Sequence, residues 1–356
     1  MSTTLTSLDA SNFDTLNAGS PPGDDDAIIA GMLQIGDQFD RFQIRAHLAQ
    51  GGMADIYRAY DLMNRREIVL KIPDKMLIGD PAQFERFQRE LEIINTLKHP
   101  AILRGLGSGQ YNRIPYLATE FIQGQSLRDL ITTAAPLPPD HAVALTRKIA
   151  EGMAYCHDHE VVHRDLKPEN IMVTADGQPI IMDFGLALTQ GGRRVTYANL
   201  SATAGTPDYM APEQIEGQRG DPRTDLYALG TMLYELLAGK VPFTADNNFA
   251  VMQLHLNGVA PRLDQIRSDV SPQLAAIVAK CLQRQPADRY ATMQALIDAL
   301  DHPETADLSV LDQEAVTTVA DIPWYKSSAV KAIGVAMIII IGLVLFAIVL
   351  QSARAQ

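Results

Sequence analysis

The chain is poor in the residues that hold small secreted folds together. Its 356 residues include one tryptophan and two cysteines, Cys156 and Cys281. Two cysteines cannot build a disulfide scaffold, and they suit a reducing compartment. Basic residues are also scarce, because 30 Lys and Arg stand against 42 Asp and Glu and leave a net charge of −12. That charge argues against nucleic acid as a partner.

The acidic charge is concentrated towards the two ends of the chain. Residues 1–40 contain seven Asp and no Lys or Arg, and residues 301–328 carry a net charge of −5. Residues 41–300 are therefore nearly neutral. The length leaves room for one large lobe or two smaller lobes between flanking segments.

Residues 1–35 have neither a basic start nor a long apolar run, so they are not a secretory signal. They are rich in Ser, Thr and Asp and contain too little apolar surface to offset the cost of ordering. We expect a disordered acidic leader.

Three blocks in the middle of the chain carry chemistry. Residues 163–170 read His-Arg-Asp-Leu-Lys-Pro-Glu-Asn, Asp-Phe-Gly follows at 183–185, and Ala-Pro-Glu at 211–213. In this order and spacing they resemble the signature set of the eukaryotic-like (Hanks-type) protein kinases. The resemblance covers roughly residues 40–300 and implies a protein kinase domain over 36–302. The implied fold is α+β and bilobal, with a small β-rich lobe containing one main helix and a larger helical lobe.

The resemblance assigns roles that suit phosphoryl transfer, which needs positioning and neutralised charge more than covalent chemistry. Asp165 would accept or orient the proton of a substrate hydroxyl, and Lys167 would meet the transferred phosphate. Asn170 and Asp183 would offer oxygen ligands to Mg²⁺. The apolar runs 171–173 and 180–182 look like short strands that support these loops.

The resemblance also implies an ATP site. Lys71 stands at the position of the lysine that holds the α- and β-phosphates, and Glu90 at that of its ion-pair partner on a helix over residues 83–97. The hinge would follow Thr119, the gatekeeper, with the Glu120 carbonyl and the Ile122 amide bonding adenine. Met172 would pack beneath the base.

The segment expected to cover the phosphates departs from the usual Gly-x-Gly-x-x-Gly pattern. The first and third glycines are replaced by alanines, which costs the hairpin some conformational freedom. The Gly-Gly-Met run is similar to that of many bacterial members and suggests a bacterial source. The residues assigned to this loop are Leu48, Ala49, Gln50, Gly51, Gly52, Met53, Ala54, Asp55 and Ile56.

An activation segment would lie between Asp183 and Glu213. Thr206 would hydrogen-bond Asp165 and Lys167, an arrangement that favours Ser/Thr over Tyr as acceptor. Thr196, Ser201 and Thr203 are candidate regulatory sites, since a phosphate there adds charge that Arg164 could pair. We expect activation by autophosphorylation, on Ser201 or Thr203.

Two structural roles follow from the same resemblance. Asp225 would anchor the backbone of the catalytic loop, and Arg289 would pair with Glu213. An amphipathic helix over 140–160 would run into that loop and end near His157 and His159. A zinc site at these histidines lacks a supporting cysteine or carboxylate frame.

The C-terminal part predicts a membrane anchor. Residues 303–328 form an acidic linker of 26 residues, which we expect to be a flexible coil, and Ala332–Leu350 are 19 uncharged, mainly apolar residues. Such a run nearly spans a ~30 Å hydrocarbon core. Trp324 to Lys326 and Lys331 would lie at the cytoplasmic interface. This predicts a transmembrane helix over 329–351, a short tail over 352–356, and a cytoplasmic kinase domain on a single-pass protein of the cell membrane.

Three functions remain open on these grounds. The first is a membrane-anchored Ser/Thr protein kinase that uses ATP and Mg²⁺, phosphorylates protein substrates and acts in signal transduction. The second is a pseudokinase, a binding module suggested by the altered glycine loop. The third is a kinase-fold enzyme for small molecules. Gly205-Thr206 and Ala-Pro-Glu argue against it, because they indicate a peptide-binding surface. Gly334 and Gly342 suggest a possible homodimer within the membrane.

Overall fold

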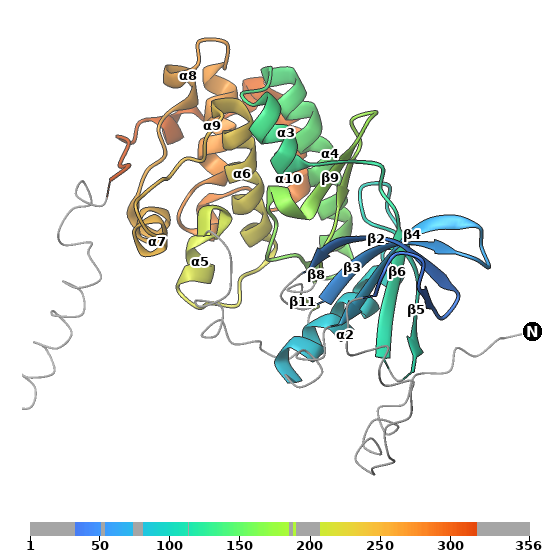
Figure 1. Cartoon of the computed structure of the whole chain (residues 1–356). Coiled ribbons are helices and arrows are strands. Elements are labelled where there is room, and N and C mark those ends of the chain that lie inside the picture. Colours follow the sequence, from blue (N-terminus) through green and yellow to red (C-terminus); the bar gives the residue numbers. More distant parts are fainter. Residues whose placement is uncertain are drawn as a thin grey trace, which may run out of the picture. The chain divides into compact units, whose positions relative to one another are not determined.

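The computed structural model describes residues 33–50, 54–73, 81–112, 114–184, 188–189 and 207–318 (Figure 1). The chain divides into two compact units. One comprises residues 1–74 and 108–118, and the other comprises residues 75–107 and 119–356.

A six-stranded sheet with the strand order β1-β2-β3-β4-β6-β5 dominates the first unit. The first residues of β5 and the last residues of β6 are assigned to the second unit. Neighbouring strands from β1 to β4 are antiparallel. Alternate residues of β4, namely Ile68, Leu70 and Ile72, are buried, as expected for strands with one face on a core. The strands are Gln38–Phe39 (β1), Phe42–Gln50 (β2), Ala54–Asp61 (β3), Arg66–Pro73 (β4), Gly105–Tyr111 (β5) and Ile114–Glu120 (β6).

The second unit is mainly helical, so the implied contrast between a strand-rich and a helical lobe is confirmed. Its α-helices in the described part of the chain are Pro81–Thr96 (α2), Leu127–Ala134 (α3), Pro139–Asp158 (α4), Pro212–Ile215 (α5), Pro222–Ala238 (α6), Asn248–Asn257 (α7), Leu263–Ile266 (α8), Pro272–Cys281 (α9) and Met293–Asp301 (α10). The expected helices over 83–97 and 140–160 correspond to α2 and α4.

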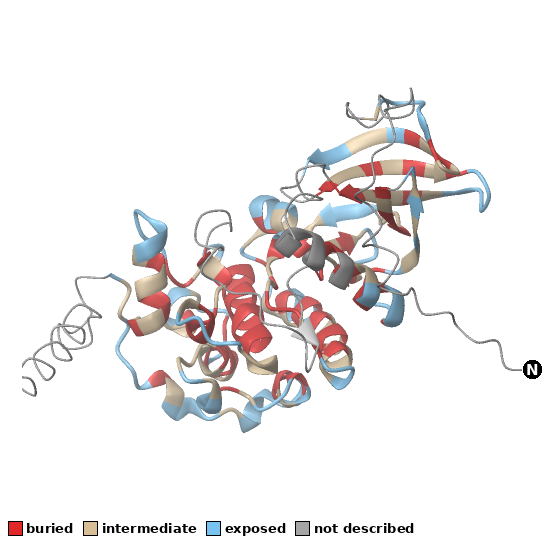
Figure 2. Cartoon of the chain, turned by 90° about the horizontal axis from the view of Figure 1, so that it is seen from below, coloured by how far each residue is buried: buried red, intermediate tan, exposed pale blue. Residues whose placement is uncertain are grey.

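Helix α6 forms the centre of this unit. Every residue from Thr224 to Leu237 is buried, which is typical of a core helix with neighbours on all sides (Figure 2). Helices α6 and α9 pack closely at Gly230 of α6. A Cβ added to this glycine would lie 2.4 Å from the Cβ of Cys281 in α9. Glycine is therefore needed there for packing. Gly239, with a φ of 73°, ends the helix in the left-handed conformation.

Short strands support the predicted catalytic loops. Strands Gly124–Ser126 (β7), Ile171–Thr174 (β9) and Pro179–Ile181 (β10) form a sheet in the order β10-β9-β7. Val161–Val162 (β8) pairs with Leu188–Thr189 (β11). The predicted short strands at 171–173 and 180–182, between Asn170 and Asp183, are thus confirmed as β9 and β10.

Helix α2 corrects one detail of the expected architecture. It was expected in the small lobe, but it groups with the second unit. The connection that follows it explains this grouping. The Lys98 amide donates to the Tyr155 hydroxyl of α4 at 3.2 Å, and the Leu103 amide donates to the Ile181 carbonyl of β10 at 2.9 Å. These bonds tie the end of α2 to the helical unit.

The prediction of a flexible coil from residue 303 is wrong for residues 303–318. This segment contains the 3₁₀ turns Pro303–Thr305 (η7) and Leu308–Leu311 (η8). Val316 exchanges two backbone hydrogen bonds with Val259, at 2.9 and 3.1 Å. Leu311 is only 5 % exposed. The buried Leu311 side chain thus packs on the helical unit, although the surrounding segment is acidic. The composition of the segment does not indicate this contact.

Several predicted features lie outside the described residues: the tip of the glycine loop (Gly51, Gly52, Met53), the phosphorylation sites Thr196, Ser201 and Thr203, the substrate-site Thr206 and the segment 329–351. Within the described ranges, no helix combines the length and the apolar character needed to cross a bilayer.

Candidate active site

The loop that carries Asp165 is attached to α6 through its backbone. The carboxylate of Asp225 accepts the His163 amide at 2.9 Å and the Arg164 amide at 2.8 Å. Arg164 has a φ of 67°, a left-handed conformation that costs on the order of 1–3 kcal/mol for a non-glycine residue. The two bonds to Asp225 offset that cost, so the predicted anchoring role of Asp225 is confirmed.

His163 connects this loop to the following one. Its Nε2 lies 2.9 Å from the Met182 carbonyl oxygen, and the Asp165 amide donates to its Nδ1 at 3.3 Å. A carbonyl only accepts and an amide only donates, so the neutral tautomer with hydrogen on Nε2 satisfies both contacts. The ring is fully buried and acts as a structural bridge, as expected.

The polar centre of the loop consists of Asp165, Lys167 and Asn170. The Lys167 ammonium donates to Oδ2 of Asp165 at 2.8 Å, and both side chains are 30 % exposed. The Asn170 amide nitrogen donates to the Asp165 carbonyl at 2.7 Å and to Oδ2 at 3.1 Å. Three predicted catalytic residues are therefore in direct contact, and the Asp165 carboxylate has a defined orientation.

Asp183 and Phe184 lie beside this centre in the chain's next loop. The Met182 amide donates to the Asn170 carbonyl at 2.8 Å, which ties the two loops together. Asp183 has a φ of 59° and is exposed, whereas Phe184 is fully buried with its ring 5.0 Å from the His163 ring. The buried Phe184 ring packs against the same histidine that orients Asp165.

The donor set of this region fits Mg²⁺. Because Nδ2 of Asn170 donates to two oxygens of Asp165, the amide oxygen Oδ1 is left as an acceptor, with no hydrogen bond in the described part of the chain. An amide oxygen together with the carboxylate of Asp183 is the type of hard oxygen donor that Mg²⁺ prefers. Asn170 and Asp183 are thus suited to hold a metal that accompanies a nucleotide.

His157 supports Asp225 and does not point to zinc. Its Nε2 lies 2.8 Å from the Asp225 carboxylate, while Nδ1 of His159 lies 2.8 Å from the Tyr155 carbonyl. Burial alone would raise the pKa of Asp225, but the hydrogen bond and charge of His157 and the bonded amides outweigh burial and lower it. No group of three or more metal-binding side chains of the His, Cys, Asp and Glu type occurs among the described residues.

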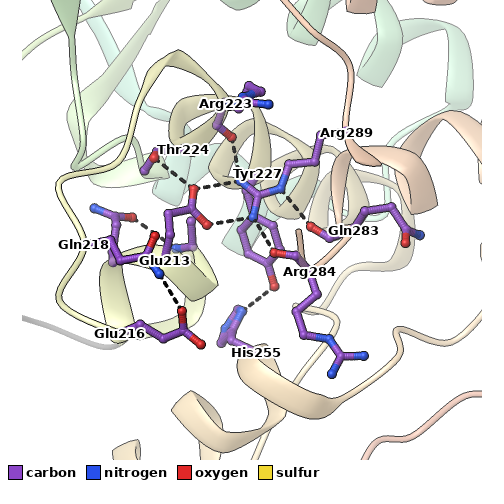
Figure 3. A network of polar contacts seen from close by, with 12 residues as sticks. Glu213, Glu216, Gln218, Arg223, Thr224, Tyr227, His255, Gln283, Arg284 and Arg289 are labelled. Atoms are coloured by element: carbon purple, nitrogen blue, oxygen red, sulfur yellow. Dashed lines mark hydrogen bonds and ion pairs between the residues drawn. The ribbon is translucent and has the colours of Figure 1, made fainter. Parts of the chain in front are cut away.

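A second buried pair fixes the end of the activation segment (Figure 3). The Arg289 guanidinium donates to both carboxylate oxygens of Glu213, at 2.8 and 2.7 Å, and the side chains are 0 % and 4 % exposed. Thr224 of α6 donates to the same carboxylate at 2.9 Å. The prediction that Arg289 pairs with Glu213 is confirmed.

The predicted phosphate-covering loop has its expected hairpin frame. Strands β2 and β3 pair antiparallel with Ala49 opposite Ile56 and Gln50 opposite Asp55, so the chain reverses between Gln50 and Ala54. The register shifts between His47 and Ala49, which marks an irregularity at Leu48. Ala54 is buried.

The remaining ATP-site predictions fall on both units. Lys71 lies half-buried in β4 of the first unit, whereas Glu90 is a buried residue of α2 in the second. Their pairing therefore stays a prediction. Thr119 is buried at the end of β6, and Met172 is half-buried in β9.

Glu120, at the predicted hinge, is hydrogen-bonded to the backbone of Arg104. The Glu120 amide donates to the Arg104 carbonyl at 3.1 Å, and the Glu120 carboxylate accepts the Arg104 amide at 2.9 Å. Within the described ranges no hydrogen bond engages the Ile122 amide. The Ile122 amide is therefore available for the predicted hydrogen bond to adenine.

One network next to the catalytic loop was not found from the sequence. Arg128 of α3 donates at 2.8 Å both to Glu169 and to Glu235, and it also bonds the Tyr209 hydroxyl. Tyr209 in turn donates to Glu235. These residues lie 41 to 107 positions from Arg128, and no local pattern links them. Burial and the charges of Glu235 and Glu169 raise the pKa of the neighbouring Asp208 to about 6, against the lowering effect of Arg128.

Comparisons with known proteins agree with this geometry. The model of the protein kinase domain matches residues 42–300. The serine/threonine-protein kinase PknL of Mycobacterium tuberculosis is 35% identical over 292 residues, which cover 81% of this chain and 70% of PknL. The serine/threonine-protein kinase PknB of Mycolicibacterium smegmatis is 35% identical over 259 residues, covering 71% of this chain and 41% of PknB.

A solved structure gives the same result for the fold. The crystal structure of the Mycobacterium tuberculosis PknI kinase domain superposes with a TM-score of 0.60 at 25% sequence identity. The match covers 76% of this chain and 100% of that domain.

Proposed function

This chain belongs to the serine/threonine protein kinase family, and from that premise we propose that it transfers the γ-phosphate of ATP to serine and threonine hydroxyls of proteins. The observation that carries the proposal is the contact between Asp165, Lys167 and Asn170. The Asp165 carboxylate is oriented by the Lys167 ammonium at 2.8 Å and by the Asn170 side-chain amide at 3.1 Å.

The chain's own residues supply positioning and charge. Oδ2 of Asp165 is occupied by Lys167 and Asn170, so Oδ1 is the oxygen that meets the proton of the acceptor hydroxyl. Lys167 is within reach of that centre and reduces the negative charge that develops on the transferred group. Bound Mg²⁺–ATP supplies the phosphoryl group and further neutralises its charge, and Asn170 and Asp183 would hold the metal. Lys71, paired with Glu90, would position the α- and β-phosphates.

The decisive experiment compares carboxylate-to-amide changes at two aspartates. Full-length chain is incubated with Mg²⁺, labelled ATP and a general protein substrate, and phosphoamino acids are analysed. We expect phosphoserine and phosphothreonine from the wild type and a loss of about 10²–10⁴-fold in rate for Asp165→Asn, because the oriented base is removed. Asp176→Asn, an exposed change in the turn between β9 and β10, is the matched control and should leave the rate unchanged.

Three results would contradict this proposal. Absence of labelled product from the folded wild type would favour the pseudokinase. Equal rates for wild type and Asp165→Asn would show that another protein causes the labelling. Transfer to small hydroxylated molecules without transfer to protein would favour the third hypothesis.

We further propose that the kinase autophosphorylates on Ser201 or Thr203 and that the phosphate activates it. The motivation is the hydroxyl-rich activation segment and the cationic Arg164 of the catalytic loop. The side-chain amide of Gln214, just after Ala-Pro-Glu, donates to the Arg164 carbonyl at 2.8 Å. The double change to alanine should lower the initial rate on a peptide substrate, whereas Thr133→Ala on the exposed side of α3 should not. An unchanged initial rate for the double variant would contradict activation by these sites.

We propose that the chain is held at the cell membrane by residues 329–351, with the kinase domain in the cytoplasm. Support comes from the uncharged run Ala332–Leu350 and from the neighbouring Trp324 and lysines. Deleting 329–351 should move the protein from the membrane pellet to the soluble fraction without loss of transfer activity. If the full-length chain is already soluble after cell lysis, the anchor and any dimer formed through it are wrong.

A further inference from the structure

The helical unit contains a cavity that lies away from the catalytic loop. It has a volume of about 60 Å³ and lies between α6, α9, the loop before α8 and the C-terminal segment. In Figure 1 this end of the described chain, coloured orange-red, lies beside α8 and α9. Its walls combine polar and apolar groups in similar proportion, and the apolar side chains include Val259, Leu263, Val278, Ala279 and Leu311.

Two polar groups of the cavity wall lack a side-chain hydrogen bond within the part of the chain that the structure describes. Tyr234 of α6 is 1 % exposed, and its hydroxyl makes no hydrogen bond in the described part of the chain. Among the described residues the Arg284 guanidinium makes no hydrogen bond or ion pair, and only its backbone carbonyl is engaged, by the Arg289 guanidinium at 3.0 Å. Figure 3 shows the Arg284 side chain extending away from the Glu213–Arg289 pair. An unsatisfied buried hydroxyl is costly, so this arrangement calls for a ligand or water that accepts a hydrogen bond.

The other arginine of the wall is already engaged. Arg262 forms an ion pair with Asp264 at 2.7 Å and donates weakly to the Leu311 carbonyl at 3.4 Å. It therefore holds the C-terminal segment over the cavity, while Arg284 is the cation left for a ligand. The apolar side chains of this mixed wall, together with two donors that have no partner among the described residues, fit a molecule that has an apolar body and an anionic, hydrogen-bond-accepting head.

We propose that this cavity binds a small amphiphilic carboxylate, whose carboxylate takes the donors of Arg284 and Tyr234 and whose apolar body lies against α9. Because Val310, Leu311 and Gln313 belong to the C-terminal segment, such a ligand contacts both that segment and the helical unit. Binding would thus strengthen the docking of residues 303–318. The proposal does not depend on the kinase reaction.

The test uses hexanoate as the probe and hexan-1-ol, with the same chain length and a neutral head, as its comparison. Both are titrated into the full-length chain and followed by calorimetry in one buffer. Saturable hexanoate binding at least about tenfold tighter than hexanol binding is expected, because only hexanoate offers a charge to Arg284. Arg284→Gln should remove this preference.

Three further variants separate the cavity from the surface. Ala279→Leu fills the cavity and should weaken hexanoate binding about tenfold or more, whereas Ala287→Leu, at an exposed position after α9, should not. Tyr234→Phe should weaken binding but not lower the melting temperature of the free protein, since it removes an unpartnered hydroxyl.

Three outcomes would overturn the proposal. No saturable binding of hexanoate would mean that the cavity holds only water. Equal affinity for hexanoate and hexanol in the wild type would remove the role of Arg284. Binding that is indifferent to Ala279→Leu, in a variant that still unfolds cooperatively, would place the site elsewhere.

Discussion

At the scale of single residues, His255 shows how strongly burial controls protonation. It lies in α7 with its Nδ1 2.7 Å from the Tyr227 hydroxyl, while its Nε2 is buried without a hydrogen bond in the described residues (Figure 3). Burial lowers its pKa from 6.5 to about 3. The folded protein therefore keeps this histidine neutral where an unfolded chain would protonate it.

The consequence is a loss of stability in mild acid. Below about pH 6.5 the unfolded chain binds a proton that the folded chain does not, so the free energy of unfolding falls as the pH drops towards 3. At about pH 4.5 this loss should be on the order of 3 kcal/mol. Urea unfolding of the wild type and of His255→Gln at several pH values measures it.

In that comparison the stability difference between wild type and variant should shrink as the pH falls from 7 to 4.5. His141→Gln, at an exposed position of α4, serves as the control and should keep the wild-type pH profile. Parallel profiles for wild type and His255→Gln would show that His255 does not titrate in the unfolding transition.

Asp225 leads to a different prediction at the same scale. Asp225→Asn keeps one acceptor oxygen but places an amide donor opposite one of the two backbone amides, that of His163 or that of Arg164. We expect a loss of roughly 1–3 kcal/mol in stability, because a buried donor is left unpaired, and a lower kcat because the left-handed Arg164 backbone loses support. Denaturant unfolding and steady-state kinetics check both effects, and a variant with wild-type kcat would contradict the anchoring role in catalysis.

At the scale of elements, two ion pairs that join helices differ mainly in how far they are buried. The Glu213–Arg289 pair joins α5 to the chain before α10 and is almost fully buried. The Arg147–Asp301 pair joins α4 to α10, and the two side chains are 39% and 40% exposed. Both have good distances, of 2.7 and 2.8 Å, so geometry alone does not distinguish them.

Their removal should nevertheless have very different effects. Glu213→Gln leaves the buried Arg289 charge without compensation and should lower the free energy of unfolding by about 3–5 kcal/mol. Asp301→Asn breaks an exposed, solvent-screened pair and should change the free energy of unfolding far less than Glu213→Gln does. Equal losses in denaturant unfolding would show that burial does not determine the contribution of these pairs.

At the scale of the whole molecule, the folded region extends beyond the family match. The match ends at residue 300, yet the chain continues in contact with the helical unit to at least the pairing of Val316 with Val259. Of the predicted 26-residue linker, only residues 319–328 lie outside the described part.

Two leucines of the same 3₁₀ turn test the docking of this segment. Leu311 is 5 % exposed, whereas Leu308 is 44 % exposed. Leu311→Ala should lower stability by about 2–5 kcal/mol, because it removes a buried side chain and leaves a cavity. Leu308→Ala should change it by no more than about 0.5 kcal/mol. Similar small effects of both changes on the melting temperature would mean that the segment does not pack in solution.

The sequence by itself determined the chemistry. The blocks at 163–170, 183–185 and 211–213 identify the reaction class, because phosphoryl transfer requires particular side chains at short, fixed spacings. The short strands between these blocks and the amphipathic helix over 140–160 could be predicted for a similar reason, since apolar patterning is a local property. The helix over 83–97 followed from the family resemblance. The partnership of Asp225 with the catalytic loop and that of Arg289 with Glu213 followed from the family resemblance.

Only the tertiary structure decided which distant residues meet. The contacts of Arg128 with Glu169, Tyr209 and Glu235, the raised pKa of Asp208 and the docking of residues 303–318 each depend on side chains far apart in the chain. Such contacts are set by how the helices pack around α6, and burial then determines the protonation and the energy of each group. Neither packing nor burial is contained in the spacing of residues along the chain.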